Sequence, residues 1–384
     1  ALLAQFGRAF GFQPNGQGFE SLGGRVFFII YEMSERWQSW EALDEGKIRC
    51  LTCSHRCTIA PGRSGICQVR RNVDGKLFSP VYGRAIAVHV DPIEKKPLHH
   101  FLPGSSIYSL GTLGCNLKCD FCQNWDISQV EYARGRKSKG DDIEDSILGQ
   151  HLSPEQIVAK CIQTNQQSIA FTYNEPSVFI DYAMDTARLA KARGLHTVFV
   201  TNGYESAEAV EHLAGLIDAF NVDVKAFTEE FYRNHCKAKL APVLETVQRA
   251  HNAGIWVEVT TLLIPGENDG DAELDQLTKW LASVSTTIPW HISAFHPDFK
   301  LTDKEVTPVS TLERAYQIGK RNGLQYIYMG NVRGAGRENT DCPKCGVQLV
   351  QRSGMMSTRI VDQNFDVSTG KCKKCQKVIE GVWS

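Results

Sequence analysis

Ser106-Ile-Tyr-Ser-Leu110 and the residues that follow, Gly111-Thr-Leu-Gly-Cys115-Asn-Leu-Lys-Cys119-Asp-Phe-Cys122-Gln-Asn-Trp125, decide the fold of this chain. The first five residues form an apolar run typical of a buried β-strand, and three cysteines lie on the loop directly after it. Up to Asn331 similar runs alternate with helical segments, which is typical of parallel strands joined by crossover helices. The other predicted strands are Ser168–Tyr173, His196–Thr201, Ala219–Val224, Trp256–Leu263, Trp290–Phe295 and Tyr326–Met329.

This alternation predicts an α/β fold, and we expect a partial (β/α)6-type TIM-like barrel of about six strands with a seventh at its edge. A doubly wound open sheet is the alternative, because the order of strands in a sheet cannot be read from one sequence. Helix signals support the pattern. Ser153-Pro154-Glu155-Gln156 predicts a capping box, and Gly194 follows a helical stretch at a position that favours left-handed backbone.

Cysteine-rich regions flank the predicted barrel. We divide the chain into an N-terminal extension of residues 1–40 without a recognised pattern, a tetracysteine module of residues 41–104, the barrel of residues 105–335, and a second tetracysteine module of residues 336–384. The last of these resembles a zinc ribbon or a rubredoxin, because two cysteine pairs face each other across a ribbon.

Composition and charge narrow the classes of partner. The chain has 384 residues, and its 42 basic and 43 acidic side chains leave a net charge of −1. No strong positive field therefore attracts nucleic acid or an anionic lipid surface. The longest apolar runs, such as Val26–Tyr31, are far shorter than the ~20 residues of a membrane span. We expect no membrane partner and no nucleic-acid partner.

Cysteine spacing indicates metal centres. Of the 13 cysteines only Cys161 and Cys236 stand outside three tight groups. Tight C-x2-C and C-x3-C pairs are typical of thiolates that converge on metal, whereas secreted proteins scatter cysteines between distant loops. We therefore predict a reducing cytoplasm, with a disulfide framework as the alternative.

The central group is Cys115-x3-Cys119-x2-Cys122. Three thiolates on one short loop, without a local fourth, suit a cubane iron–sulfur cluster in which one iron has no protein ligand. That open iron can bind a substrate. A zinc site or plain structural thiols are the alternatives, but structural zinc needs a closed fourth position.

The two outer groups each contain four cysteines, enough to close around one metal centre. The N-terminal group, Cys50, Cys53, Cys57 and Cys67, suits zinc or a further iron–sulfur cluster, with either a structural or an electron-relay role. The C-terminal group is Cys342, Cys345, Cys372 and Cys375. Here we favour zinc over iron, because a closed tetrahedron of four thiolates is the common structural solution.

The three-cysteine loop, with Phe121 directly before its third cysteine, resembles the signature of the radical S-adenosylmethionine (SAM) superfamily. Five further segments are similar to the AmmeMemoRadiSam-system enzymes, which are relatives of pyruvate formate-lyase activating enzymes. These segments are Cys50–Cys57, Pro61–Cys67, Asp91–Leu98, Cys122–Gln129 and Ile264–Asp269.

The resemblance implies that Cys115, Cys119 and Cys122 hold a [4Fe–4S] cluster whose free iron binds SAM. One-electron reduction would cleave SAM to a 5′-deoxyadenosyl radical, which abstracts hydrogen from an unidentified substrate, with a protein as one candidate. It also implies a reduced ferredoxin or flavodoxin as electron donor, and association with AMMECR-like and MEMO-like proteins. A glycyl-radical-enzyme activase is one alternative, and a metal-bearing scaffold for nucleic acid or protein is another.

Candidate SAM-binding residues follow the predicted strands, because barrel enzymes gather their chemistry at the carboxyl ends of strands. Thr172, Asn174 and Glu175 stand where the superfamily has a Gly-Gly-Glu-like segment, although both glycines are missing here. Asn174 could instead cap the helix that Pro176 opens. Asn202, at the end of the third strand, resembles a family position near SAM, but an Asn-Gly pair is also common in turns.

The remaining candidates follow later strands. Asp223 and Lys225 match an Asp-x-Lys of the activating enzymes, with a buried ion pair as the alternative reading. Glu258 or Thr260 would touch SAM if their shared face points inward. His296 is the candidate proton relay, because imidazole titrates near neutral pH, although a structural histidine is the alternative. Asn331 would pack near adenine or simply form a turn.

Overall fold

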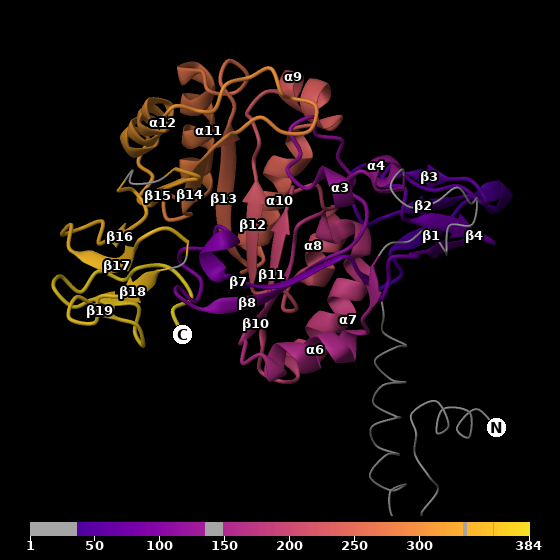
Figure 1. The fold of residues 1–384 in the computed structure, drawn as a ribbon, viewed down its shortest axis with the longest axis horizontal. Coiled ribbons are helices and arrows are strands. Elements are labelled where there is room, and N and C mark those ends of the chain that lie inside the picture. Colours follow the sequence, from indigo (N-terminus) through magenta and orange to yellow (C-terminus); the bar gives the residue numbers. More distant parts are fainter. Residues whose placement is uncertain (1–36, 135–148, 333–335, 356) are drawn as a thin grey trace, which may run out of the picture. The chain divides into compact units, whose positions relative to one another are not determined.

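Seven parallel strands, arranged side by side in chain order, form the central sheet of the computed structural model (Figure 1). The structure describes residues 37–134, 149–332, 336–355 and 357–384. The strands are β8 (Ser106–Gly111), β10 (Ser168–Phe171), β11 (His196–Thr201), β12 (Ala219–Asp223), β13 (Trp256–Leu263), β14 (Trp290–Ala294) and β15 (Ile327–Gly330). Each predicted strand is confirmed with its ends within two residues.

The order of strands distinguishes between the two predicted topologies. A doubly wound sheet reverses its order at a switch point, whereas this sheet runs β8-β10-β11-β12-β13-β14-β15 without a reversal. The strand β7 (Ala87–Pro92) pairs antiparallel with β8 and extends the other edge. No ladder joins β15 to β7 among the described residues, so the barrel is partial, as predicted.

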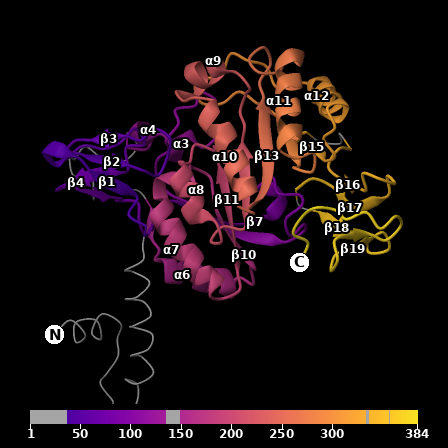
Figure 2. The same cartoon turned by 180° about the vertical axis from the view of Figure 1, so that it is seen from behind.

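Helices connect the parallel strands, and Figure 2 shows several of them on the side of the sheet seen from behind. The connections contain α6 (Pro154–Gln163), η3 (Pro176–Phe179), α7 (Ile180–Lys191), α8 (Ala207–Leu213), α9 (Glu229–Phe231), the π-turn η4 (Tyr232–Cys236), α10 (Ala241–Asn252), α11 (Asp271–Val284) and α12 (Val309–Arg321). The predicted capping box is present, because Ser153 Oγ accepts from Gln156 N and Gln156 Oε1 accepts from Ser153 N. Gly194 has the predicted positive φ, +70°.

The core lies between the sheet and these helices. Phe171, Phe199 and Phe220, on three adjacent strands, are fully buried and their rings stack or meet edge to face. Each buried aromatic side chain stabilises the fold by roughly 1.5–3 kcal/mol relative to an exposed one. This layer holds the strands in register and so fixes where each strand ends.

The N-terminal cysteines lie in a region of short strands. It contains β1 (Trp40–Ala42), η1 (Asp44–Gly46), β2 (Ile48–Cys50), β3 (Thr58–Ile59), β4 (Arg71–Val73), β5 (Lys76–Phe78) and β6 (Arg84–Ala85). Its core is small, with Ile48, Cys50 and Ile59 buried together. The loops between this region and α6 contain η2 (Ile93–Lys95), α3 (Trp125–Ser128), α4 (Val130–Arg134) and β9 (Gln150–His151).

The C-terminal cysteines lie in a second group of short strands beside β15 (Figure 1). These strands are β16 (Thr340–Asp341), β17 (Gln348–Arg352), β18 (Thr358–Ile360), β19 (Phe365–Asp366) and β20 (Lys371–Cys372). Tyr326 and Tyr328 of the barrel share one apolar cluster with Phe365 and Trp383, so this region packs directly on the barrel.

Residues 39–384 form one compact unit. The predicted boundary near residue 105 falls between β7 and β8, which are neighbours in the central sheet, whereas the boundary near residue 336 falls between strands of two different sheets. Most of the predicted extension, residues 1–40, lies outside the described residues. All 13 cysteines are free thiols, so the structure contains no disulfide framework. None of the helices described is long and apolar enough to cross a membrane.

Candidate active site

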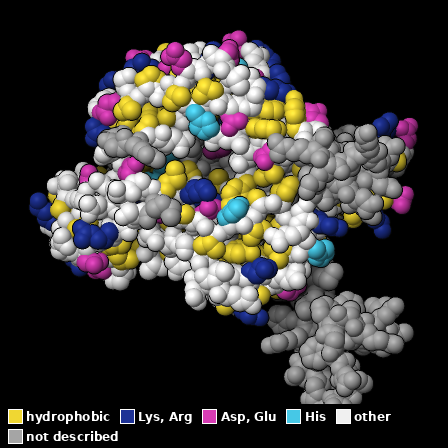
Figure 3. Space-filling view, viewed as in Figure 1, with side chains coloured by type: hydrophobic (Ala, Val, Ile, Leu, Met, Phe, Trp, Pro, Cys, Tyr) yellow, Lys and Arg dark blue, Asp and Glu magenta, His cyan; other side chains and the backbone are white. Residues whose placement is uncertain are grey.

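A cavity of about 840 Å³ opens at the carboxyl ends of the parallel strands. Figure 3 shows a hollow near the middle of one face, where hydrophobic, basic, acidic and histidine side chains meet. The cavity brings together most of the residues singled out from the sequence. Those on its wall are Cys115, Cys119, Cys122, Thr172, Asn174, Glu175, Asn202, Asp223, Lys225, Thr260 and Asn331.

Cys115, Cys119 and Cys122 all face this cavity from the loop after β8. Their sulfurs do not lie within 4.8 Å of one another, whereas four thiolates around one zinc ion stand about 3.8 Å apart. In a cubane the ligands bind separate iron corners and are spaced more widely. The three thiols therefore fit a cubane cluster, to which they would supply three ligands and which would lie at the cavity wall.

Cys236, on η4, stands outside the three cysteine groups of the sequence, but it lies against this loop. The protonated Cys119 thiol donates a hydrogen bond to the Cys236 sulfur, and this bond, followed by burial, raises the pKa of Cys119 well above the ordinary value. Cys236 is fully buried and is not on the cavity wall, so it does not occupy the open side. Backbone bonds from Lys118 N to Cys236 O (3.0 Å) and from Asp120 N to His235 O (3.1 Å) clamp the loop from outside.

Asn174 holds the three-cysteine loop from the inside. Its Oδ1 accepts from Thr112 N at 3.0 Å, and its Nδ2 donates to Gly114 O at 2.6 Å. Asn174 is therefore not the helix cap that the sequence offered as an alternative. Glu175 is that cap, because its Oε1 accepts from Ser177 N at 2.9 Å.

The Glu175 carboxylate has further internal partners. Its Oε2 accepts from Asn202 N at 2.9 Å, and Thr201 Oγ1 lies 3.0 Å from Oε1. The same hydroxyl bonds to Glu205, whose pKa is raised well above its ordinary value by burial and by Glu175. Glu175 thus orients the Asn202 backbone. The side-chain Nδ2 of Asn202 in turn donates a hydrogen bond to Asn116 Oδ1 at 2.7 Å.

Asp223 and Lys225 form the ion pair that the sequence offered as an alternative, with Lys225 Nζ 2.8 Å from Asp223 Oδ2. The Asp223 side chain is 37% exposed and the Lys225 side chain 14% exposed, so the pair faces the cavity. Burial disfavours the charged amine, but the charge of Asp223 and the neighbouring Cys119 and Cys236 hold the pKa of Lys225 well above its ordinary value. The pair therefore offers one group of each charge to a ligand.

Glu258 and Thr260 share one face of β13, as predicted, but lie at different depths. Thr260 is on the cavity wall, whereas Glu258 is fully buried below it. The Glu258 carboxylate accepts from His99 N (2.9 Å), His100 N (2.8 Å) and His291 Nε2 (2.6 Å). Its oxygens thus have internal partners in place of the expected contact with SAM.

His296 also differs from its expected place. It is exposed, bonds to Gln123 at 3.1 Å and is not on the cavity wall. The imidazoles on the wall are His99 and His291, which the sequence analysis did not select as candidates. Asn331 is exposed at the cavity rim with φ +59°, and its Nδ2 donates to Ala294 O at 3.1 Å.

Register places four of the wall residues in one row across the sheet. Asp223 of β12 pairs with Thr260 of β13, Thr260 with His291 of β14, and His291 with Tyr328 of β15. Period-two alternation within β13 was visible in the sequence, and it placed Thr260 and Glu258 on one shared face. Alternation alone does not say which residues of different strands stand side by side.

A second polar network reaches the cavity from the segment after β7. Lys96 and Asp91 form a buried ion pair at 2.6 Å, and Tyr173 donates to the same Asp91 oxygen at 2.6 Å. Burial raises the pKa of Asp91, but the bonds from Lys96 and Tyr173 outweigh it and hold that pKa far below the ordinary value. Tyr173 has a left-handed φ of +71°, which is strained for a residue with a side chain.

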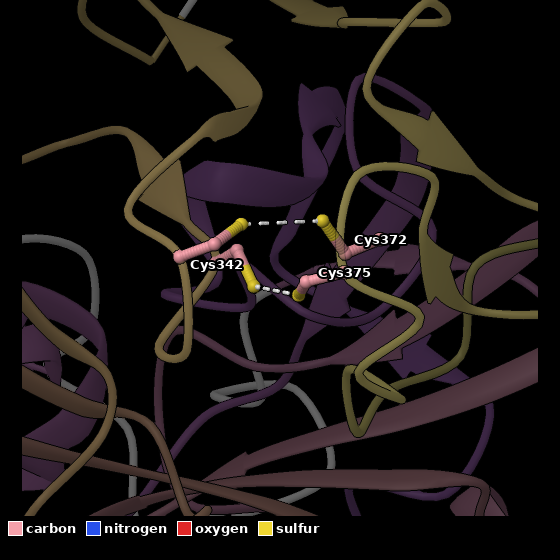
Figure 4. Close-up of side chains that lie close together, drawn as sticks. Cys342, Cys372 and Cys375 are labelled. Atoms are coloured by element: carbon pink, nitrogen blue, oxygen red, sulfur yellow. Dashed lines mark hydrogen bonds between the residues drawn. The ribbon is translucent and has the colours of Figure 1, made fainter.

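The C-terminal cysteines converge as predicted. Cys342 and Cys375 sulfurs are 3.4 Å apart, and those of Cys345 and Cys372 are 3.7 Å apart. Figure 4 shows these side chains pointing toward one another from two loops. All four sulfurs lie within 4.8 Å of one another, the spacing of a single tetrahedral metal ion.

The N-terminal cysteines lie near one another but do not form such a compact group. Cys50, Cys53 and Cys67 are buried, and Cys57 is half-buried. Burial raises the pKa of Cys53, and so do Cys50, Cys67 and Cys57 nearby.

Comparison with known proteins agrees with this geometry. Residues 110–278 match the model of the radical SAM superfamily. An uncharacterized protein of Methanocaldococcus jannaschii is 41% identical over 344 residues, which cover 89% of this chain and 98% of the relative. The chain therefore belongs to the radical SAM superfamily, and it is an enzyme.

More distant relatives are named as activating enzymes. Benzylsuccinate synthase activating enzyme of Thauera aromatica is 26% identical over 150 residues, 37% of this chain and 45% of that protein. Pyruvate formate-lyase 1-activating enzyme of Escherichia coli is 20% identical over 229 residues, 56% of this chain and 89% of that protein. A solved radical SAM methyltransferase from Sphaerobacter thermophilus is 16% identical with a TM-score of 0.45, over 65% of this chain and 71% of that one.

Proposed function

We propose that this enzyme cleaves SAM reductively at a [4Fe–4S] cluster held by Cys115, Cys119 and Cys122, and abstracts a hydrogen atom from a protein substrate. The supporting observation is that these three thiols share one cavity with the polar groups at the strand ends. When bound, the cluster and SAM would supply one-electron cleavage of the sulfonium bond and a 5′-deoxyadenosyl radical. The protein orients the reactants and excludes water.

The residues of the cavity divide into binding and positioning groups. Thr172, Asn202 and Thr260 offer hydrogen bonds to SAM, while the Asp223–Lys225 pair offers a charge of each sign to SAM or substrate. The side chains of all five residues lie on the cavity wall, where a bound ligand would contact them. Asn331 at the rim would contact the adenine end.

Asn174, Glu175 and Glu258 act through other groups. Asn174 fixes the loop that carries the cysteines, and Glu175 fixes the Asn202 backbone. Glu258 orients His291, so we propose His291 in preference to His296 as the group that holds or moves a proton at the substrate.

The names of two relatives support the proposal of a protein substrate. Two of the relatives reported above are named as activating enzymes, and the Asp223-x-Lys225 pattern resembles that of the activating enzymes, so a glycyl-radical-enzyme activase is the second candidate. Either function requires a one-electron donor, and a reduced ferredoxin or flavodoxin is the proposed partner.

Association with AMMECR-like and MEMO-like proteins remains a proposal that rests on the family resemblance. A cytoplasmic location remains a proposal that rests on the free thiols.

Zinc is the metal that we propose for Cys342, Cys345, Cys372 and Cys375, because their compact spacing suits a closed tetrahedron. A metal-bearing scaffold for nucleic acid or protein is less well supported, since the net charge of −1 provides no broad basic field.

Anaerobic reconstitution followed by reduction with dithionite in the presence of SAM tests the proposal. We expect 5′-deoxyadenosine to form, and the Cys119→Ala variant to form none, because it cannot hold the cluster. Cys161→Ala is the matched control, since Cys161 is a buried thiol on α6 away from the cavity. Product formation at the normal rate by Cys119→Ala would contradict the assigned ligands. A glycyl radical signal on a candidate partner would favour the activase.

A further inference from the structure

The two tetracysteine groups differ in the spacing of their sulfurs. All four C-terminal sulfurs lie within 4.8 Å of one another, with pairs at 3.4 and 3.7 Å. Among the described residues no three of Cys50, Cys53, Cys57 and Cys67 meet that limit. Zinc bound at about 2.3 Å by four sulfurs requires them to stand about 3.8 Å apart. The C-terminal group has this spacing and the N-terminal group does not.

The N-terminal sulfurs nevertheless lie close enough to interact with one another. Each of Cys53, Cys57 and Cys67 interacts electrostatically with Cys50, and three of the four thiols are at least nine-tenths buried. Backbone N–H groups of His55 and Val69 are directed at the sulfurs of Cys53 and Cys67. Such N–H···S bonds are typical of thiolates that ligate iron–sulfur clusters, where they help to set the reduction potential.

Charge around this group also suits an anionic centre. Arg70 is a fully buried guanidinium, paired with Asp181 at 2.8 Å. It lies close enough to Cys50 and Cys67 to interact with their charges, and its Nε has no hydrogen-bond partner in the protein. A buried, partly unpaired cation beside two of the sulfurs is stabilised if those sulfurs carry negative charge as metal thiolates.

The apolar core of this region is too small to hold it without a metal. The buried cluster around β2 contains only Ile48, Cys50 and Ile59, with a few partly buried neighbours. Small modules with little core usually depend on metal for their folding. We therefore expect a metal centre in this region. It must bind sulfurs that are spaced more widely than those around a single zinc ion.

The region touches the loop that carries the three catalytic-site cysteines. His55 Nε2 lies 2.9 Å from Asn116 O, the residue after Cys115. On the other side of Cys115, a Cβ atom on Gly114 would come within 2.8 Å of Val69 Cγ1 and 3.1 Å of Cys67 O. Gly114 has a φ of +95°, so both its conformation and this close approach favour glycine.

We propose that Cys50, Cys53, Cys57 and Cys67 hold a second [4Fe–4S] cluster, which passes electrons to the cluster at Cys115, Cys119 and Cys122. A low-potential one-electron carrier, such as a reduced flavodoxin, would reduce the second cluster from its 2+ to its 1+ state. The second cluster then returns to 2+ as it gives that electron to the neighbouring cluster, so electrons balance at each transfer. Only the relay role rests on the proposed SAM chemistry.

Metal analysis of the full-length protein, isolated without oxygen, tests the second cluster. We expect about eight irons, about eight acid-labile sulfides and about one zinc per chain. Cys53→Ser should lose about four irons and four sulfides but keep its zinc, whereas the matched control Cys161→Ser should keep all of them. A wild-type protein with about four irons and two zinc ions, or a Cys53→Ser variant that loses zinc in place of iron, would overturn the proposal.

A second measurement covers the case in which Cys53→Ser does not fold. The Cys119→Ser protein lacks the open cluster, so after reduction its electron paramagnetic resonance spectrum should contain a [4Fe–4S] signal that SAM does not change. Absence of any iron–sulfur signal in this folded variant would count against a second cluster.

The relay is tested by comparing two reductants. Cys53→Ser should lose 5′-deoxyadenosine formation with reduced flavodoxin but retain it with dithionite, which reaches the remaining cluster directly. Unchanged product with flavodoxin would refute the relay. If wild-type protein forms no product with either reductant, the proposed function fails, while the iron count still decides whether the second cluster exists.

Discussion

Glu258 on β13 and His291 on β14 are joined inside the barrel by a hydrogen bond of 2.6 Å between Glu258 Oε2 and His291 Nε2. The Glu258 side chain is fully buried and that of His291 is 4% exposed. Burial disfavours the carboxylate, but His291, His100 and the His99 N–H outweigh it and lower the pKa of Glu258. One buried charge therefore organises the floor of the cavity.

Replacing Glu258 by Gln should destabilise the fold. The change removes the negative charge that accepts hydrogen bonds from His99 N, His100 N and His291 Nε2. Breaking such a buried charged network costs about 3–5 kcal/mol in the free energy of unfolding. The free energy of unfolding in urea, measured at pH 7, provides the test. Glu245→Gln changes an exposed ion pair with Arg249 on α10 and should shift stability by no more than about 0.5 kcal/mol. Equal midpoints for Glu258→Gln and wild type would contradict the assignment.

His100 should make stability depend on pH. Its Nδ1–H donates to Glu380 O and its Nε2 accepts from Tyr328, so the neutral ring fits. Burial is the main reason that the pKa of His100 falls to about 4. In the unfolded chain the pKa of this histidine is about 6.5. At pH values between about 6.5 and about 4 the unfolded chain therefore binds more protons than the folded chain. The free energy of unfolding should thus drop by about 2 kcal/mol from pH 7 to pH 5.

The His100→Gln variant isolates this contribution. Glutamine can still donate to Glu380 O and accept from Tyr328, but it does not titrate. Urea unfolding at pH 7 and at pH 5 should therefore show a smaller loss of stability in the variant than in wild type. The same loss in both proteins would exclude His100 as its source.

Cys236 should tune the cluster without binding it. The two thiols are hydrogen-bond partners, and when Cys119 ligates the cluster as a thiolate the Cys236 S–H is the group left to donate. Hydrogen bonds to ligand sulfurs influence the reduction potential of iron–sulfur clusters. Cys236→Ala should retain the iron of wild type, but its cluster should be harder to reduce, with a more negative midpoint potential in a redox titration. Loss of about four irons from this variant would instead make Cys236 a ligand.

Arg352 should fasten the C-terminal module to the barrel. It donates to His99 O at 2.7 Å and faces Glu94 at 3.5 Å, with both charged side chains at most 2% exposed. Arg352→Met leaves Glu94 buried without its cation, which should cost about 3–5 kcal/mol in the free energy of unfolding. Arg359→Met, on the exposed β18, is the control.

A double variant tests the physical cause. Adding Glu94→Gln to Arg352→Met removes the unpaired carboxylate, so part of the lost stability should return. If the losses in free energy of unfolding caused by Arg352→Met and Glu94→Gln simply add in the double variant, the ion pair with Glu94 is not the source of the stability that Arg352 contributes.

The sequence by itself determined the strands, the sharing of faces and the three-cysteine loop, because each follows from local spacing. Alternation put Thr260 and Glu258 on one face, and C-x3-C-x2-C placed three thiols on one turn. Both patterns act over a few residues, where backbone geometry leaves little freedom.

Only the tertiary structure decided how residues from different elements meet. Strand order and register put Asp223, Thr260 and His291 in one row, and depth in the barrel separated Glu258 from the cavity. His99 and Cys236 become neighbours of the site through contacts that span more than 100 residues of chain. Such contacts depend on how helices and modules pack on the sheet, and the spacing of residues within one segment carries no information about that packing.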